Sequence, residues 1–177
     1  MNPYSLLAKQ AVENYINDNI VIIPPADLPK EFFERKSGVF VTIMKDGELR
    51  GCIGTYSPTR KNIAEEIIYN SIAAATEDYR FGKIKKEEFP RLSYEISILN
   101  VPEQIKDMKE LDPKKYGIIV MTNSFPIKSA LLLPDLEGVD TIEQQIAICC
   151  QKGAISPEKE RLVIYKFTTE KIKDDDK

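Results

Sequence analysis

The sequence contains no histidine and no tryptophan, and only three of its 177 residues are cysteines. Without histidine, the chain cannot form a Ser-His-Asp or Cys-His catalytic pair, nor the zinc sites that are built on histidine. Cys149 and Cys150 are adjacent and lack the CxxC spacing of a metal or redox motif. Glycine-rich phosphate-binding motifs are missing too. The sequence therefore predicts no cofactor and no metal site, and leaves open only an ion site built from Asp and Glu oxygens.

Long apolar stretches are also missing. No run approaches the roughly 20 residues that span a bilayer, and the N-terminus lacks the basic and apolar segments of a signal peptide. The net charge is −3 with both signs mixed along the chain, which argues against broad nucleic-acid binding. So few cysteines agree with a reducing compartment. We therefore expect a globular cytoplasmic protein with neither a nucleic-acid partner nor a membrane partner.

The periodicity of apolar residues predicts both helices and strands. Helical spacing covers residues 5–17, 63–76 and 142–150, and alternation covers residues 92–99 and 161–167. A hairpin is predicted over residues 38–55, because Asp46 and Gly47 stand between two strand-like segments, and the favoured two-residue turn needs positive φ at both positions. Residues 171–177 are highly charged and are predicted to be a disordered tail.

The second half of the chain repeats the order of elements in the first half. Hairpins begin at residues 38 and 117, the following helices begin at residues 63 and 142, and a strand closes each half. The sequence predicts an α+β fold with a mostly antiparallel sheet and flanking helices. A single domain, residues 1–170, would contain two hairpin–helix–strand units at residues 38–99 and 117–167.

The return strand of the first hairpin contains the most unusual stretch, Leu-Arg-Gly-Cys-Ile-Gly at residues 49–54. Glycine weakens a strand and usually marks a bulge or the close approach of another group. We prefer ligand access as the explanation for Gly51 and Gly54, because the corresponding residues of the second hairpin, 130–133, are Ala-Leu-Leu-Leu.

Two side chains of this stretch have alternative interpretations. Cys52 is either a nucleophile or a small packed side chain, and packing is favoured because no histidine can act as its base. Arg50 and Arg80 either clamp an anion or form ion pairs with Glu48, Glu77 or Asp78, and these two interpretations are evenly balanced. Strand alternation places Arg50 and Cys52 on one face, where the guanidinium would favour a thiolate.

These residues resemble the AMMECR family, also called protein A of the AmmeMemoRadiSam system. The motif at residues 49–54 is present without change. The helix that ends in Ala73-Ala74-Ala75 is followed by Asp78-Tyr79-Arg80-Phe81, where Tyr79 replaces the family's proline. Residues 130–134, Ala-Leu-Leu-Leu-Pro, have alanine in place of the usual glycine. The resemblance covers residues 6–167. It implies an α+β fold with two subdomains around a cleft, and a Memo-type protein and a radical SAM protein as partners, but it implies no known reaction.

Our first functional hypothesis is a binding or accessory module that holds a small anionic ligand or a partner peptide in a cleft. The residues expected to bind it are Arg50, Gly51, Cys52, Ile53, Gly54, Thr55, Asp78, Arg80 and Phe81. The alternative is an enzyme in which Cys52 is the catalytic nucleophile. Glu77, Asp78 or a tyrosine would then have to move the proton.

Overall fold

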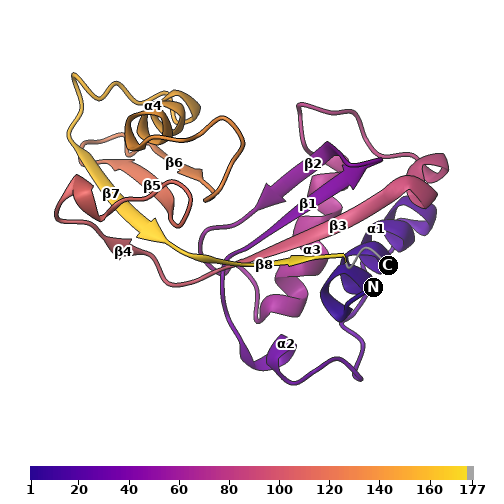
Figure 1. The fold of residues 1–177 in the computed structure, drawn as a ribbon. Coiled ribbons are helices and arrows are strands. Elements are labelled where there is room, and N and C mark those ends of the chain that lie inside the picture. The colour runs from indigo at the N-terminus through magenta and orange to yellow at the C-terminus, as the bar shows by residue number, and fades with distance from the viewer. Residues whose placement is uncertain (175–177) are drawn as a thin grey trace. The chain divides into compact units, whose positions relative to one another are not determined.

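The structure is a computed structural model that describes residues 1–174 (Figure 1). Its elements, in chain order, are α1 (Pro3–Asp18), α2 (Glu31–Glu34), β1 (Val39–Lys45), β2 (Glu48–Gly54), α3 (Ile63–Thr76), the 3-10 helix η1 (Lys86–Arg91), β3 (Leu92–Leu99), β4 (Glu103–Gln104), the 3-10 helix η2 (Met108–Glu110), β5 (Gly117–Thr122), β6 (Ser129–Leu132), α4 (Ile142–Lys152), β7 (Leu162–Phe167) and β8 (Thr169–Lys173).

The chain divides into two compact units. Unit 2 comprises Leu99–Thr169, and unit 1 comprises Met1–Ile98 together with the residues from Glu170 onward. Unit 2 is thus inserted in the chain between β3 and β8, which are neighbouring strands of the unit 1 sheet. The strand order is β2-β1-β3-β8 in unit 1 and β4-β7-β5-β6 in unit 2. The predicted α+β class is confirmed, with antiparallel pairing in two four-stranded sheets.

The two sheets are built in the same order. In unit 1, β1 pairs with β2 of its hairpin and with β3, and α3 lies between β2 and β3 in the chain. In unit 2, β5 pairs with β6 and β7, and α4 lies between β6 and β7. Each unit therefore contains a hairpin, a helix and a closing strand in the same order.

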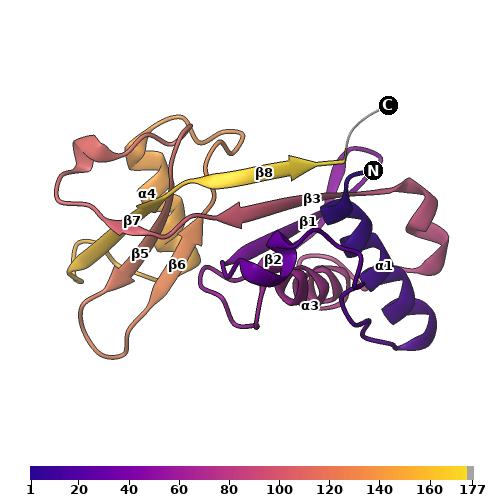
Figure 2. The same ribbon diagram turned by 90° about the horizontal axis from the view of Figure 1, so that it is seen from below.

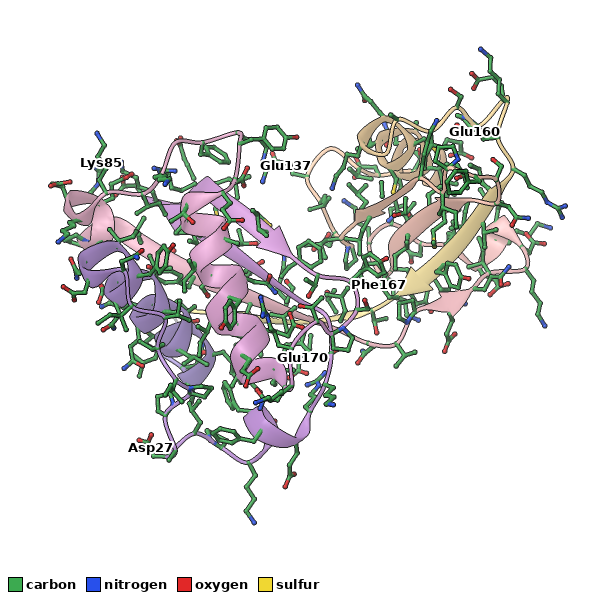
Figure 3. The ribbon with its side chains drawn as sticks, turned by 180° about the vertical axis from the view of Figure 1, so that it is seen from behind. Asp27, Lys85, Glu137, Glu160, Phe167 and Glu170 are labelled. Atoms are coloured by element: carbon green, nitrogen blue, oxygen red, sulfur yellow. The ribbon has the colours of Figure 1, made fainter. Side chains whose placement is uncertain are left out.

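The core of unit 1 lies between its sheet and two helices. Alternate residues of β1 are buried, and together with Tyr94, Ile96 and Ile98 of β3 they pack with α1 and α3 on one face of the sheet (Figure 2). Figure 3 views unit 1 from the side of these helices. The hairpin turn has the predicted backbone, because φ is 52° at Asp46 and 83° at Gly47. Asn62 caps α3 by accepting a hydrogen bond from the backbone N–H of Glu65 (3.0 Å).

The core of unit 2 packs α4 against β5 and β6. It contains Ile118, Val120 and Leu132 from the strands, and Cys149 and Cys150 from the helix. The two cysteines are 0% and 3% exposed, so they serve as small apolar side chains, as expected. Among residues 1–174, no helix has the length and the apolar content needed to cross a membrane.

The prediction of a disordered tail is wrong for residues 171–173. They belong to β8, which lies beside β3 at the edge of the unit 1 sheet. Glu95 on β3 forms ion pairs with Lys171 (3.1 Å) and Lys173 (3.6 Å), and Ile172 packs against the apolar core. The lysines that suggested disorder are thus on the exposed side of a strand whose opposite side places Ile172 against the apolar core. Residues 175–177 lie outside the described part of the chain.

Candidate functional site

The strand that carries the Leu-Arg-Gly-Cys-Ile-Gly motif, β2, is an edge strand, and the segment after α3 covers its open side. The backbone N–H of Cys52 donates a hydrogen bond to Asp78 Oδ2 (2.9 Å), and the Cys52 carbonyl accepts one from Arg80 Nη2 (3.3 Å). Backbone groups on an exposed edge otherwise pair with other chains. Asp78 and Arg80 therefore take the place that a further strand would occupy beside Cys52.

Asp78 and Arg80 also form an ion pair with two hydrogen bonds between their side chains. Arg80 Nε donates to Asp78 Oδ1 (2.9 Å), and Arg80 Nη2 donates to Oδ2 (2.7 Å). Asp78 is only 6% exposed, and the hydrogen bond from Arg80 is the main reason that its pKa falls to about 2, against the opposing effect of burial. Asp78 therefore stays ionised and is a weak proton acceptor, which disfavours the expectation that it moves a proton for Cys52.

Arg50 is held by a residue that the sequence did not suggest, Glu88 of η1. Its Nε and Nη2 donate to Glu88 Oε2 (3.0 Å) and Oε1 (3.1 Å), and Nη1 donates to the Gly82 carbonyl (2.8 Å). Lys45 also reaches Glu88 (2.9 Å). Chiefly because of the hydrogen bond from Arg50, the pKa of Glu88 falls to about 2. Both arginines of the predicted clamp thus form internal ion pairs. The partner of Arg80, Asp78, is one of the residues expected from the sequence, whereas the partner of Arg50, Glu88, is not.

A β-bulge explains why strand alternation misplaced Arg50. Ile43 of β1 pairs with Gly51, and the next residue, Met44, pairs with Leu49, so Arg50 is the additional residue between them. The expected arrangement of Arg50 beside Cys52 on a regular strand face is therefore wrong. Its guanidinium extends to η1 and the preceding loop instead.

The two glycines of the motif are surrounded by the protein's own atoms. A Cβ at Gly51 would collide with the backbone carbonyl oxygen of Ala74 on α3, and its carbonyl carbon would lie only 3.2 Å away. A Cβ at Gly54 would collide with Phe40 and with the carbonyl oxygen of Val39. The preference for ligand access is therefore wrong at these positions, because helix α3 and strand β1 need the space.

The remaining motif side chains lie on different sides of the sheet. The thiol of Cys52 is partly exposed and lies 3.3 Å from the hydroxyl of Thr42 on the neighbouring strand. Ile53 packs against the apolar core, and the ring centroid of Phe81 lies 5.4 Å from the Arg80 guanidinium carbon. The predicted site residues Cys52, Asp78, Arg80 and Phe81 are brought together, whereas Ile53 and Thr55 are directed elsewhere.

Glu66 on α3 is a buried carboxylate that the sequence reasoning missed. It is 1% exposed and accepts hydrogen bonds from the Thr55 hydroxyl (2.9 Å), the backbone N–H groups of Thr59 and Arg60 (2.7 Å for Arg60), and the Asn70 side chain (3.3 Å). A glutamate within the apolar face defined by Ile63 and Ile67 was the available signal. Glu66 fixes the loop that follows β2, since both of its oxygens bond to that loop.

This loop forms one wall of a pocket of about 320 Å³, which we call the α3 groove. It is lined by Tyr15, Val21, Thr55, Thr59, Arg60, Tyr69, Asn70, Ile72, Ala73 and Glu77. The Arg60 guanidinium carbon lies 3.7 Å from the centroid of the Tyr69 ring, a short cation–π contact that orients the charge. Of the predicted ligand-binding residues, Thr55 lines this groove.

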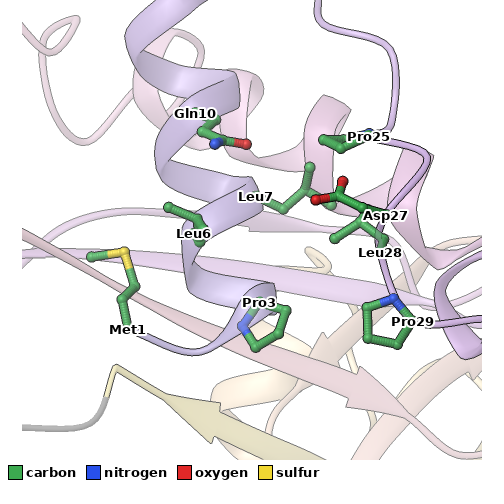
Figure 4. Close-up of a pocket in the computed structure, with 9 residues that line it drawn as sticks. All are labelled: Met1, Pro3, Leu6, Leu7, Gln10, Pro25, Asp27, Leu28 and Pro29. Carbon is green, nitrogen blue, oxygen red and sulfur yellow. The ribbon is translucent and has the colours of Figure 1, made fainter.

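A second pocket, of about 250 Å³, lies between α1 and the proline-rich segment before α2 (Figure 4). Its lining is mainly apolar, with Leu6, Leu7 and Leu28 among the contributors, and its one carboxylate is Asp27. It contains no basic side chain and no residue of the motif. Its chemistry does not match an anionic ligand.

Comparisons with a family model, with related sequences and with a solved structure each give a match over nearly the whole chain. A family model described as AMMECR1 matches residues 6–172. A protein of Thermotoga maritima is 46% identical over 173 residues, which cover 97% of this chain and 98% of that protein. A longer protein of Clostridium acetobutylicum is 40% identical, and the match covers 98% of this chain and 36% of that protein. The crystal structure of uncharacterized protein PH0010 from Pyrococcus horikoshii has a TM-score of 0.86 and 34% identity, covering 95% of this chain and 88% of that chain.

Proposed function

The chain belongs to the AMMECR1 family, and we propose that it is a binding module that holds a small anionic ligand in the α3 groove. The observation that carries this proposal is that Arg60 lines the groove without an acidic partner among the ion pairs of residues 1–174. It is the one basic side chain among the residues that line the groove. The ion pairs within residues 1–174 engage Arg35, Arg50, Arg80 and Arg91 but not Arg60.

Arg60 is also held in place before a ligand arrives. Its backbone N–H is bound by buried Glu66 and its guanidinium lies over Tyr69. A guanidinium presents a planar set of donors that suits a carboxylate or phosphate. Because side chain and loop are already ordered, binding an anion costs less conformational entropy than recruiting a flexible arginine.

The groove also explains the small side chain at Ala73. This residue lies on the partly exposed face of α3 and contributes to the groove lining. A larger side chain here would extend into the pocket without entering the core. Ala73→Leu should therefore exclude the ligand while the fold is retained.

The test is a binding screen of a panel of monocarboxylates, dicarboxylates and phosphate esters, read out by calorimetry and thermal shift. A ligand of the α3 groove should lose at least tenfold in affinity in Arg60→Met and in Ala73→Leu. Lys61→Met removes the same charge from the neighbouring, exposed residue, and Ala147→Leu makes the same change on an exposed face of α4, so both controls should bind normally. Ligands that bind Arg60→Met as tightly as wild type would contradict the proposal.

The alternative, an enzyme with Cys52 as nucleophile, has less support. The guanidinium expected to favour its thiolate, Arg50, is bonded to Glu88, and Asp78 is a weak base because its pKa is about 2. What supports this alternative is the partly exposed thiol beside the Thr42 hydroxyl. Active-site labelling of Cys52 by an electrophilic substrate analogue, with loss of turnover in Cys52→Ser, would establish it.

The partners and location in this proposal rest on the sequence and on the family resemblance. We propose a cytoplasmic protein that acts with a Memo-type protein and a radical SAM protein. Affinity purification of the tagged chain from its native cells tests this directly. Recovery of neither protein under gentle conditions would contradict the association and leave the ligand site unaffected.

A further inference from the structure

The α3 groove has charges of opposite sign at its two ends. Arg60 lies over Tyr69 at one end, and Glu77 lines the other end, where α3 stops. The backbones of Tyr69 and Glu77 are more than two helical turns apart, which corresponds to about 12 Å along the helix axis at a rise of 1.5 Å per residue. A ligand that fills the groove would therefore meet a cation and a carboxylate at separate points.

The negative end is stronger than one carboxylate suggests. Glu77 is the C-cap residue of α3, and the last turn of this helix contains no basic side chain. The carbonyl groups of Ala73 and Ala75 in this last turn already accept hydrogen bonds from the backbone N–H groups of Glu77 and Ile84, and the partial negative charge of the helix C-terminus favours a neighbouring cation. Glu77 is exposed, and none of the ion pairs described within residues 1–174 involves it. The ends of the groove thus favour an anionic group at Arg60 and a cationic group at Glu77.

Between Arg60 and Glu77 the lining of the groove is uncharged. Ala73, Ile72 and Val21 provide an apolar lining, and the Thr55 hydroxyl and the Asn70 side-chain amide are already bonded to Glu66. Tyr15, Thr59 and Tyr69 add hydroxyl groups to the lining, but Arg60 and Glu77 are its two charged residues. The groove therefore favours a ligand whose charged groups match both of these residues and the length between them. This pattern disfavours a compact inorganic anion, which would use Arg60 alone.

We propose that the ligand of the α3 groove is a short peptide of three or four residues with free termini. Its carboxylate would bind Arg60 and its ammonium group would bind Glu77. An extended chain advances about 3.3–3.6 Å per residue, so three to four residues match the separation of about 12 Å. A pocket of about 320 Å³ is large enough for such a peptide with small side chains. This inference rests on the proposed function, because the peptide's carboxylate would be the anionic group that binds Arg60 in the same groove.

The experiment uses a randomised tripeptide library in three forms: with free termini, N-acetylated, and amidated at the C-terminus. Binding to the full chain is measured by native mass spectrometry and by NMR titration. The free form should bind wild type at least tenfold more tightly than either blocked form. In Glu77→Gln the preference over the N-acetylated form should disappear, and in Arg60→Met the preference over the amidated form should disappear. Glu87→Gln and Lys61→Met are matched controls at exposed positions and should keep both preferences.

The outcomes separate the two proposals. If free and N-acetylated peptides bind equally, with an effect of Arg60→Met but none of Glu77→Gln, the groove takes an anion only; the peptide inference is then overturned and the proposed function stands. If no peptide form binds but an anion from the first panel depends on Arg60, the inference again fails alone. If neither panel depends on Arg60, both proposals fail.

Discussion

Replacing Gly51 with alanine is the sharpest test of how the motif strand is built. The added Cβ would collide with the carbonyl oxygen of Ala74, and it would lie 3.2 Å from that residue's carbonyl carbon. The obstacle is helix backbone, so no side-chain rotation relieves the contact. Either α3 or β2 must shift, although the apolar core between the unit 1 sheet and its helices resists such a movement.

The magnitude follows from two opposing effects. Forcing an additional carbon into a packed interior costs about 1–3 kcal/mol. Alanine recovers roughly 0.5–1 kcal/mol, because glycine loses more backbone entropy when it folds. The difference between these two ranges is a net loss of about 0–2.5 kcal/mol, centred near 1 kcal/mol, in the free energy of unfolding, and each 1 kcal/mol corresponds to a fall of about 2–4 °C in melting temperature for a chain of this size.

Gly82→Ala is the matched control. An added Cβ at Gly82 meets no atom within 4 Å. This variant should stay within about 0.5 kcal/mol of wild type. Urea titrations and thermal melts followed by circular dichroism measure both variants. If Gly51→Ala were as stable as Gly82→Ala, the close approach of α3 to β2 would not be what requires glycine, and ligand access would again be the better explanation.

Three further outcomes are expected. The pKa values of Asp78 and Glu88 are lowered to about 2, so both carboxylates stabilise the fold at pH values above their ordinary pKa values near 4 and lose this contribution as the pH falls toward 2. In urea titrations from pH 6 to pH 2, the free energy of unfolding should therefore fall more steeply for wild type than for Glu88→Gln. Glu66→Gln replaces an acceptor oxygen by an amide donor facing other donors, so it should cost about 1–3 kcal/mol at neutral pH, and an unchanged urea midpoint would contradict this. Iodoacetamide should label Cys52 faster than the buried α4 cysteines, as measured by peptide mass spectrometry, and Arg50→Met should leave the labelling rate of Cys52 unchanged. A slower labelling rate in Arg50→Met would mean that Arg50 does activate the Cys52 thiol.

The local part of the fold could be predicted because local chemistry determines it. The Asp46-Gly47 turn requires positive φ at both residues, and the structure has it. The apolar spacing of residues 63–76 gave α3 with its observed ends, Ile63–Thr76. Strand β8 was missed because its lysines form ion pairs with a strand far away in sequence, and a count of charges does not contain that pairing.

The candidate site could be predicted less completely, because its partners depend on register and on distant segments. The bulge at Arg50 shifts the alternation by one residue, and no residue of β2 taken alone indicates it. Glu88 becomes the partner of Arg50 only because η1 folds back beside β2. The Asp78–Arg80 pair was more accessible to sequence reasoning, since its two residues lie close together in the chain.

The motif and the α3 groove are connected through the end of β2. The Asp78–Arg80 pair binds the backbone of Cys52, and Thr55, immediately after the strand, donates its hydroxyl hydrogen bond to Glu66. Glu66 also binds the backbone of Arg60, so the position of the groove's cation depends on where β2 ends. A one-residue slip of β2 would move Thr55 away from Glu66 and reverse the faces of the strand. The glycines, the bulge and the two ion pairs fix that register, so the residues of the motif have a physical role in positioning the walls of the α3 groove.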